Sequence, residues 1–405
     1  MNFLDRTRQF TPLVWVIIFG TFLTRTTFFM VWPFLAIILY EKFALSPARI
    51  GLILSMSGAS GTLLGFWIGH LSDRIGRKRI MLVGTAINML GFSVMAVADT
   101  VPLYTTAVIL VGMARAFLEA PGKALISDAL PERSVRELAF HLRYFMLNVG
   151  AAIGPLAGLK LGLTAQQHTF WITASTYLLL GFALTWAFRR FVSTNKTTLV
   201  VERFSDTVRI LRSDKAFLAL IIANLFIMLT YSQIEATLVQ YIQLLHFADA
   251  KVLYTWLITT NAVTIVVCQF PVLRLIERFE LHVRVIMGVT LFGVAFSAFA
   301  VIPGDATWLW IANMVVLSVG ETILFPTLNI QIDRMAPSHL KGSYFGAAAL
   351  AGFGFSLGPL VGGLLLGYFQ SGVIWWLFGA TQVGVILLYL KAVRVARVET
   401  SVGHI

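Results

Sequence analysis

The sequence contains little cysteine, little charge and no metal-binding pattern. Cys268 is the single cysteine among 405 residues, which excludes a disulfide framework and a thiolate metal cluster. The seven histidines lie far apart without an HExxH spacing, and no GxxxxGK(S/T) loop for ATP occurs. The sequence therefore predicts no bound metal and no cofactor.

Charged residues are scarce, and hydrophobic residues are abundant. Asp, Glu, Lys and Arg make up 12% of the chain, about half the fraction of an ordinary soluble domain. Hydrophobic residues make up 58%, and a soluble fold cannot cover that much apolar surface with so few charges. The composition excludes soluble enzymes, nucleic-acid-binding modules and disordered proteins, and it indicates a chain embedded in a lipid bilayer.

Apolar runs long enough to cross a bilayer recur along the whole chain. A hydrocarbon core about 30 Å thick needs roughly 20 apolar residues per helix. Breaks at glycine, proline and charge delimit twelve runs, near 13–39, 48–71, 80–98, 102–126, 139–161, 168–188, 216–243, 252–273, 283–302, 307–331, 342–368 and 371–391. We predict an all-α membrane protein with a six-helix bundle at 1–191, a cytoplasmic linker at 192–214 and a second six-helix bundle at 215–405.

Lysine and arginine are distributed unevenly about these spans. With the N-terminus inside, the predicted outer loops hold only four of the 31 basic residues, Lys42, Arg49, Lys160 and Lys251. Basic residues concentrate in cytoplasmic loops of membrane proteins. The chain is therefore predicted to cross the inner membrane with both termini on the cytoplasmic side. The same rule accounts for the net charge of +12 without nucleic acid as a partner.

One small-residue pattern repeats between the two halves. GxxxGPxxG occurs at Gly150, Gly154, Pro155 and Gly158 in the fifth span and at Gly354, Gly358, Pro359 and Gly362 in the eleventh. A repeat at matching positions indicates two related bundles. Such repeats around a central pathway are typical of secondary transporters.

The loop between the second and third spans carries a longer motif. Residues 69–79 read GHLSDRIGRKR, which matches GxxxD(R/K)xGR(R/K). With the twelve spans and the repeated halves, this motif makes the chain resemble the major facilitator superfamily over nearly its whole length. The resemblance implies alternating access between two bundles. It also implies a conformational switch that latches the outward-facing state, formed by Gly69, Asp73, Arg74, Gly76 and Arg77.

The GxxxGPxxG pattern of the fifth span resembles the antiporter motif of the drug:proton branch of that superfamily, which implies export. Small residues also let helices approach closely, and proline bends a helix. Ordinary tight packing explains the pattern as well, and its recurrence in the eleventh span favours a packing role in part. Both interpretations stay open.

Five charged residues stand at depth inside the predicted spans: Arg25, Arg115, Glu119, Glu235 and Glu321. An ionised side chain in the hydrocarbon layer is unfavourable unless it finds a partner or water, and such residues are functional candidates. They are the main evidence in the sequence for a transport site.

Arg115 and Glu119 lie four residues apart in the fourth span, so they share one helical face and can pair. In the family, an arginine of this span takes part in proton coupling, with a glycine four residues later where this chain has Glu119. We predict both residues as proton-coupling candidates. The sequence leaves open whether Arg115 is a free cation or half of a structural pair.

Glu235 and Glu321 stand in the seventh and tenth spans, where certain multidrug antiporters of the family carry acids. The resemblance implies proton exchange coupled to binding of a cationic, amphipathic substrate. A carboxyl group removed from water favours its protonated form, whereas an approaching cation favours the ionised form. Proton and substrate then compete. The predicted substrate-binding residues are Glu235, Glu321, Arg25, Tyr231, Gln233 and Trp32.

These features together predict a proton-coupled antiporter that exports small, drug-like, cationic compounds by alternating access, as a monomer. The alternative is a proton symporter that imports a sugar, a peptide, a metal chelate or another organic ion on the same fold. An arginine facing the pathway, such as Arg25, favours an anionic or zwitterionic substrate instead. No catalytic constellation is present, so an enzyme is not predicted.

Overall fold

The computed structural model describes residues 3–32, 35–45, 47–161, 163, 166–190, 204–245, 250–304, 306–369 and 372–402. These residues are almost entirely helical, and none of them lies in a β-strand. Eleven of their helical segments are long and apolar enough to cross a bilayer. The predicted all-α membrane class is confirmed.

The chain divides into two compact units. Unit 1 comprises Met1–Thr207 and Ala336–Ala349, and unit 2 comprises Val208–Met335 and Leu350–Ile405. The first division falls inside the predicted linker 192–214, of which 192–203 lies outside the described residues. The assignment of Ala336–Ala349 to unit 1 is not foreseen from the sequence, because it divides the eleventh predicted span.

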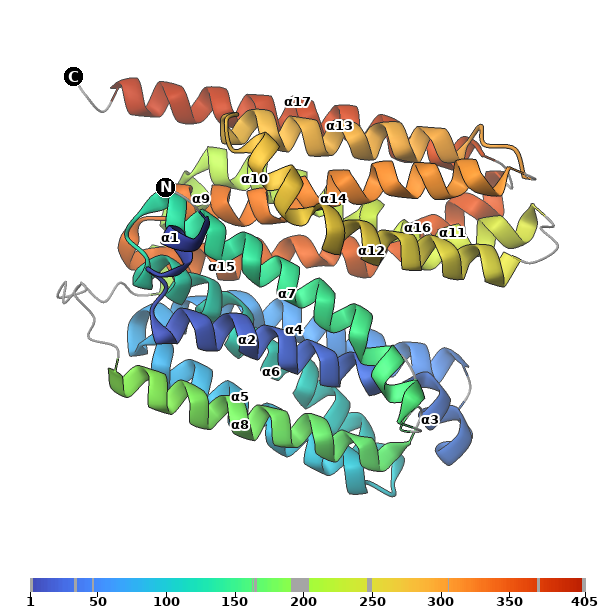
Figure 1. Ribbon diagram of the computed structural model, residues 1–405, viewed down its shortest axis with the longest axis horizontal. Coiled ribbons are helices and arrows are strands. Elements are labelled where there is room, and N and C mark those ends of the chain that lie inside the picture. Colours follow the sequence, from blue (N-terminus) through green and yellow to red (C-terminus); the bar gives the residue numbers. More distant parts are fainter. Residues whose placement is uncertain are drawn as a thin grey trace. The chain divides into compact units, whose positions relative to one another are not determined.

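Unit 1 is built from eight consecutive helices and one later helix. They are α1 (Phe3–Thr7), α2 (Pro12–Val31), α3 (Leu35–Phe43), α4 (Pro47–Ile75), α5 (Arg77–Val97), α6 (Val101–Ala129), α7 (Arg133–Lys160), α8 (Phe170–Arg190) and α15 (Lys341–Ala348) (Figure 1). The helix α9 (Phe204–Ser213) contains the boundary between the units.

Unit 2 contains the remaining long helices. They are α10 (Lys215–Tyr231), α11 (Gln233–Leu244), α12 (Ala250–Ile276), α13 (Leu281–Phe299), α14 (Thr307–Met335), α16 (Gly352–Phe369) and α17 (Val373–Val402).

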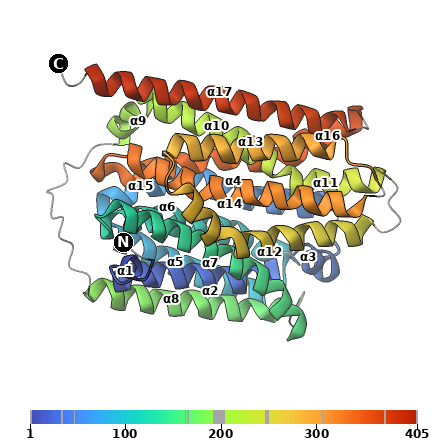
Figure 2. The same ribbon diagram turned by 45° about the horizontal axis from the view of Figure 1, so that its top comes forward.

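The same pattern of helix pairs recurs in the two units. In unit 1, α2 packs against α7 and α8, α5 packs against α6 and α8, and α4 packs against α6. In unit 2, α10 packs against α16 and α17, α13 packs against α14 and α17, and α12 packs against α14 (Figures 1 and 2). This correspondence confirms the two related bundles predicted from the repeated motif.

The fifth predicted span corresponds to α7, which is more polar than the eleven apolar segments. Arg136, Glu137, His141 and Arg143 all lie in its first half. Its 28 residues extend over about 42 Å at 1.5 Å per residue, more than the thickness of a bilayer core. Because α7 packs along α2, it supplies the twelfth helix of the predicted architecture.

Two predicted spans are not continuous helices. The run 13–39 contains α2 and α3, and residues 33 and 34 between them lie outside the described residues. The run 216–243 is divided between α10 and α11 at Ser232, and the run 342–368 contains a 3-10 turn at Ala349–Ala351. The predicted runs do not place these breaks, because each run was delimited only at its ends.

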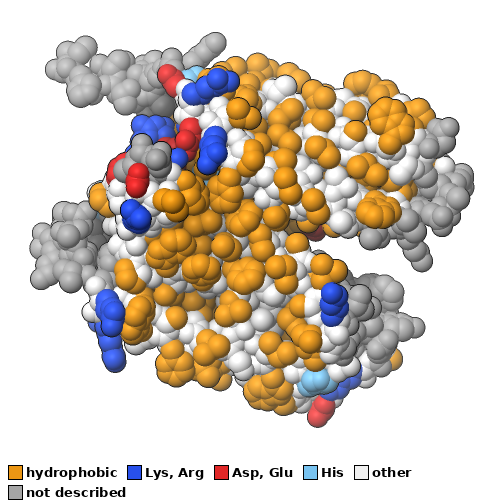
Figure 3. Space-filling view, viewed as in Figure 1, with side chains coloured by type: hydrophobic (Ala, Val, Ile, Leu, Met, Phe, Trp, Pro, Cys, Tyr) orange, Lys and Arg blue, Asp and Glu red, His pale blue; other side chains and the backbone are white. Residues whose placement is uncertain are grey.

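The surface of each unit has the distribution expected for contact with lipid. Large apolar side chains are exposed along the middle of the helices, among them Phe182, Leu179, Val383 and Leu387. Lysine and arginine lie toward the helix ends in the view of Figure 3. Basic side chains at these positions reach the lipid headgroups while the helix bodies remain in hydrocarbon.

Candidate functional site

Glu119 of α6 joins two arginines from neighbouring helices of unit 1. Arg25 Nη2 of α2 donates to Glu119 Oε1, and Arg143 Nη2 of α7 donates to Oε2, each over 2.8 Å. The arginine side chains are only 13% and 10% exposed. Both carboxylate oxygens are occupied by cations, so this triad ties α2, α6 and α7 together inside the bundle.

The sequence left open whether Arg115 pairs with Glu119, and no ion pair between these two side chains occurs in the structure. Glu119 pairs with Arg25 and Arg143 instead, and these two guanidinium groups occupy both carboxylate oxygens. The side chain of Arg115 is exposed and makes no hydrogen bond or ion pair with any residue that the structure describes. Arg143 is the ion-pair partner of Glu119 that the sequence did not predict. Its signal was a charge inside the predicted span 139–161.

Positive charge prevails around this triad. Lys123 lies one helical turn beyond Glu119 and is partly buried, and it interacts electrostatically with Glu119, Arg115, Arg25 and Arg143. The cluster thus holds four cations and one carboxylate. We call Arg25, Arg115, Glu119, Lys123 and Arg143 the basic cluster.

Glu321 has a different environment in unit 2. It is the fifteenth of the 29 residues of α14 and is only 2% exposed. The hydroxyl of Tyr231 donates to its Oε1 over 3.0 Å, and Asn261 Nδ2 donates to its Oε2 over 2.8 Å. These donors are neutral, in contrast to the arginines that hold Glu119. The partner Asn261 was not predicted, because a neutral amide in an apolar helix carries no distinctive sequence signal.

Aromatic rings surround the Tyr231–Glu321 hydrogen bond. The ring of Tyr231 stands edge-on to Phe325 with centroids 4.9 Å apart, and it lies parallel to Phe292 at 6.4 Å. Apolar walls lower the local polarity and strengthen a hydrogen bond that they enclose. The structure therefore places an ionisable carboxyl group in a mostly apolar setting at mid-depth of the helix.

The other predicted residues of unit 2 lie next to the helix break at Ser232. Glu235, in the first turn of α11, has an exposed side chain. Gln233 is fully buried and donates to the carbonyl oxygens of Leu229 and Gly358, over 2.7 and 3.0 Å. Its amide thus secures the helix break against α16. A contact of Gln233 with substrate stays a prediction.

Trp32, predicted to bind substrate, follows the end of α2 in unit 1. Its ring stacks on Phe28 with centroids 4.7 Å apart, and both pack against a buried apolar cluster that includes Phe92 and Tyr104. These contacts are those of a packing residue, and a substrate contact by Trp32 stays a prediction.

The predicted switch motif forms a compact hydrogen-bond network within unit 1. Asp73 lies next to the first residues of α15 and accepts hydrogen bonds from the backbone N–H groups of Gly342 and Ser343, over 2.8 and 2.6 Å. The Ser343 hydroxyl donates to it over 2.6 Å. Arg77 pairs with both Asp73 and Asp128. A carboxylate at a helix N-terminus satisfies otherwise unpaired N–H groups and interacts favourably with the helix dipole.

The glycines of the motif permit this approach. A Cβ atom at Gly69 would collide with the backbone at Gly342 and Gly346 of α15. Gly76 has a φ of 96°, which an L-residue rarely adopts. Arg74 is exposed and makes no side-chain hydrogen bond within the described ranges. The network therefore accounts for Gly69, Asp73, Gly76 and Arg77, and the role of the whole motif as a switch stays a prediction.

Asp73→Asn is expected to lower stability and transport together, because it leaves Arg77 without its full charge partner and weakens the cap of α15. Breaking one side of a buried ion pair costs about 3–5 kcal/mol. Thermal unfolding in detergent and transport in proteoliposomes measure the two effects. Lys78→Ala, at an exposed position of the same loop, is the matched control. Equal melting temperatures for Asp73→Asn and the control would contradict the proposed cap.

The two GxxxGPxxG patterns make close helix contacts, each inside its own unit. A Cβ atom at Gly150 would lie 2.7 Å from the Phe22 carbonyl oxygen of α2, and one at Gly154 would lie 2.5 Å from that of Thr26. In unit 2, a Cβ atom at Gly354 would collide with the Leu225 carbonyl oxygen of α10. One at Gly358 would collide with the side chains of Ser232 and Gln233 at the break between α10 and α11. Both copies thus act in packing. Pro155 lies inside α7 and Gly158 is buried, and a further role of the motif in antiport stays a prediction.

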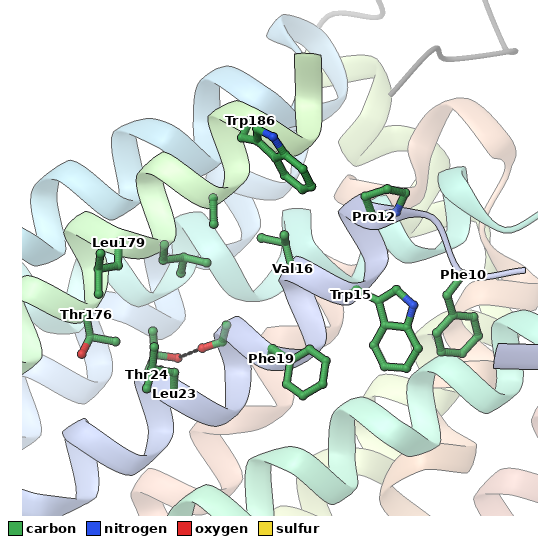
Figure 4. A pocket seen from close by; sticks show the side chains of 13 residues that line it. Phe10, Pro12, Trp15, Val16, Phe19, Leu23, Thr24, Thr176, Leu179 and Trp186 are labelled. Carbon is green, nitrogen blue, oxygen red and sulfur yellow. Dashed lines mark hydrogen bonds between the residues drawn. The ribbon is translucent and has the colours of Figure 1, made fainter. Parts of the chain in front are cut away.

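A cavity of about 510 Å³ opens between α2 and α8 of unit 1 (Figure 4). Trp15, Phe19, Leu23 and Trp186 are among its lining residues. The Thr24 hydroxyl is turned to its own helix, since it donates to the Gly20 carbonyl oxygen over 2.6 Å. None of the charged candidate residues lines this cavity, so its chemistry suits an apolar chain rather than a charged or polar solute.

The fold and the buried charges define a class of protein. Two bundles with the same helix pairing, apolar outer surfaces and ionisable groups at mid-depth are the features of a multi-pass membrane transporter. The Major Facilitator Superfamily model matches residues 17–353. The chain belongs to the major facilitator superfamily.

Relatives and solved structures agree with this assignment. The Bacillus subtilis "Uncharacterized MFS-type transporter YqjV" is 31% identical over 400 residues, which cover 96% of each chain. The Proteus mirabilis "Multidrug resistance protein MdtH" is 24% identical, with 89% of each chain covered. The structure is similar to that of the Escherichia coli fucose:proton symporter FucP, with a TM-score of 0.72, 16% identity and coverage of 93% of this chain and 97% of FucP. This last similarity shows the fold alone.

Proposed function

We propose that the protein is a proton-coupled antiporter that exports small amphipathic, drug-like compounds across the inner membrane by alternating access. It acts as a monomer with both termini in the cytoplasm. The observation that carries this proposal is the environment of Glu321, a buried carboxyl group held by the neutral donors Tyr231 and Asn261 among aromatic rings.

A proton carrier must gain and lose its proton at modest cost. Glu119 is unsuited, because protonation would leave Arg25 and Arg143 with an uncharged partner inside the bundle. Glu321 keeps a hydrogen-bonding environment in both states, since Tyr231 and Asn261 satisfy the carboxylate and an asparagine oxygen can accept from the acid. We therefore assign proton exchange to Glu321 rather than Glu119.

The exposed Glu235 supplies a negative charge close along the chain to Tyr231 and Ser232, at the break between α10 and α11. Such a carboxylate attracts a cationic group of the substrate, which favours loss of a proton from nearby acids. Because proton and substrate compete in this way, the export of substrate is coupled to the entry of protons.

Two further observations support export of drug-like compounds. The fifth-span pattern at Gly150, Gly154, Pro155 and Gly158 resembles the antiporter motif of the drug:proton branch, and the relative from Proteus mirabilis is a multidrug resistance protein. The alternative, proton-driven import, uses the same fold and differs in the sign of coupling.

The sign of coupling is tested with purified protein in proteoliposomes of known orientation. A panel of amphipathic compounds is loaded, and the imposed pH gradient is then reversed. For an antiporter, compound and protons move in opposite directions, so reversal of the gradient reverses the flux. Movement of compound and protons in the same direction would establish the symporter instead, and product formation without vectorial movement would contradict transport.

A further inference from the structure

The basic cluster of unit 1 has an unbalanced charge that proton exchange at Glu321 does not explain. Arg25, Arg115, Lys123 and Arg143 face a single carboxylate, Glu119, so there is an excess of three positive charges. Like charges held close together repel one another, and the repulsion is stronger where the side chains are partly buried. A cluster with this excess is stabilised by an anion that binds to it.

Two groups of the cluster have hydrogen-bonding capacity to spare. The exposed guanidinium of Arg115 makes no hydrogen bond or ion pair with the residues described in the structure. Arg143 is 8% exposed, and its Nε is buried without a hydrogen-bond partner there, although its Nη2 holds Glu119. A buried donor without an acceptor is rare in folded proteins and indicates a missing partner.

The position of Arg115 is that of a binding residue. It is the fifteenth of the 29 residues of α6, midway between the two ends of the helix. Arg115, Glu119 and Lys123 follow one another at intervals of four and form a stripe on one helix face. Glu119 on this stripe contacts α2 and α7, whereas the side chain of Arg115 is exposed. An arginine at this depth needs water or a counter-ion.

We propose that Arg115 binds the carboxylate of the transported compound, with Lys123 and Arg143 reinforcing the positive potential. A guanidinium group donates two parallel hydrogen bonds to a carboxylate, which gives both orientation and strength. Glu119 holds the side chains of Arg25 and Arg143 in place and thereby preserves the site. The substrate class is amphipathic organic acids, including zwitterions that carry such a carboxylate.

This inference rests on the proposed transport function for the nature of its ligand, but its geometry comes from unit 1 alone. Binding is measured separately from transport for that reason. The full-length protein in detergent is titrated calorimetrically with 2-naphthoate, with its uncharged isostere 2-naphthamide and with tetraphenylphosphonium as a cationic probe. The variants are Arg115→Gln, Arg115→Lys and the control Arg189→Gln, which removes an exposed charge at the end of α8.

The wild-type protein is expected to bind 2-naphthoate at least about tenfold more tightly than 2-naphthamide, because only the carboxylate forms a charge-assisted hydrogen bond with Arg115. Arg115→Gln removes this preference without weakening 2-naphthamide, Arg115→Lys retains part of it, and Arg189→Gln leaves it unchanged. Thermal unfolding of each variant shows that it is folded.

The proposal is overturned if the wild-type protein does not bind 2-naphthoate, if it binds acid and amide equally, or if Arg115→Gln weakens both ligands alike. Gradient-driven export of the cation alone, without binding of the acid, would overturn this site and leave the antiporter standing. Selective binding of the acid without proton-driven flux of any compound would support the site at Arg115 and overturn the proposed antiporter.

Discussion

Glu321→Gln is expected to abolish transport driven by a pH gradient while the protein still folds and binds substrate. Glutamine has the size of glutamate but cannot exchange a proton, so the coupled step has no carrier. Its carboxamide oxygen still accepts from Tyr231 or Asn261, and one mismatched donor pair costs about 1–3 kcal/mol. Efflux from proteoliposomes with an imposed pH gradient measures the loss.

The matched control is Glu280→Gln, which removes a carboxylate of unit 2 from an exposed side chain before α13. Its efflux should equal that of the wild type. Counterflow of unlabelled against labelled compound at equal pH needs no net proton movement, so Glu321→Gln should retain it. Gradient-driven efflux at the wild-type rate in Glu321→Gln would refute the assignment of proton exchange to this residue.

Glu119→Gln is expected to cause a large loss of stability. It leaves the guanidinium groups of Arg25 and Arg143 inside the bundle without a charged partner, and removal of one partner from a buried ion pair costs about 3–5 kcal/mol. Natural domains are stable by only about 5–15 kcal/mol. Thermal unfolding in detergent should therefore show a large decrease in melting temperature.

Two companion variants identify the cause of this decrease. Asp99→Asn breaks the exposed pair with Lys42 and should change the melting temperature little, since exposed pairs contribute little. The double variant Glu119→Gln, Arg143→Gln removes one of the stranded cations and should recover part of the lost stability, as coupled partners do in a double-mutant cycle. If the loss of stability in the double variant equals the sum of the losses in the two single variants, Glu119 and Arg143 act independently.

The sequence predicts the helices and the chemically unusual residues better than it predicts their partners. Glu321 stands out because an acid inside an apolar run is costly, but its donor Asn261 lies 60 residues earlier and is an ordinary residue for such a helix. Asp73 is identified by a local motif, whereas its acceptor role toward Ser343 joins positions 270 residues apart. Local patterns carry no information about pairs that only tertiary packing brings together.

The question about Arg115 that the sequence leaves open has the same physical origin. A spacing of four residues makes a pair geometrically possible, but a buried carboxylate takes the cations that packing places nearest to both of its oxygens. In this fold those cations come from α2 and α7. The predicted helix at 139–161 already contained Arg143, yet nothing in the sequence shows that it points toward Glu119.

The triad around Glu119 has a consequence for biogenesis. Arg25 emerges from the ribosome 94 residues before the carboxylate that neutralises it, and Arg143 emerges 24 residues after that carboxylate. A lone arginine at the centre of an inserting helix carries a penalty of roughly 2.5–3.5 kcal/mol on the translocon scale. The helix α2 is thus poorly suited to partition into lipid alone. Insertion together with α6 and α7 places Arg25 beside the carboxylate of Glu119 and leaves the triad with a single net positive charge.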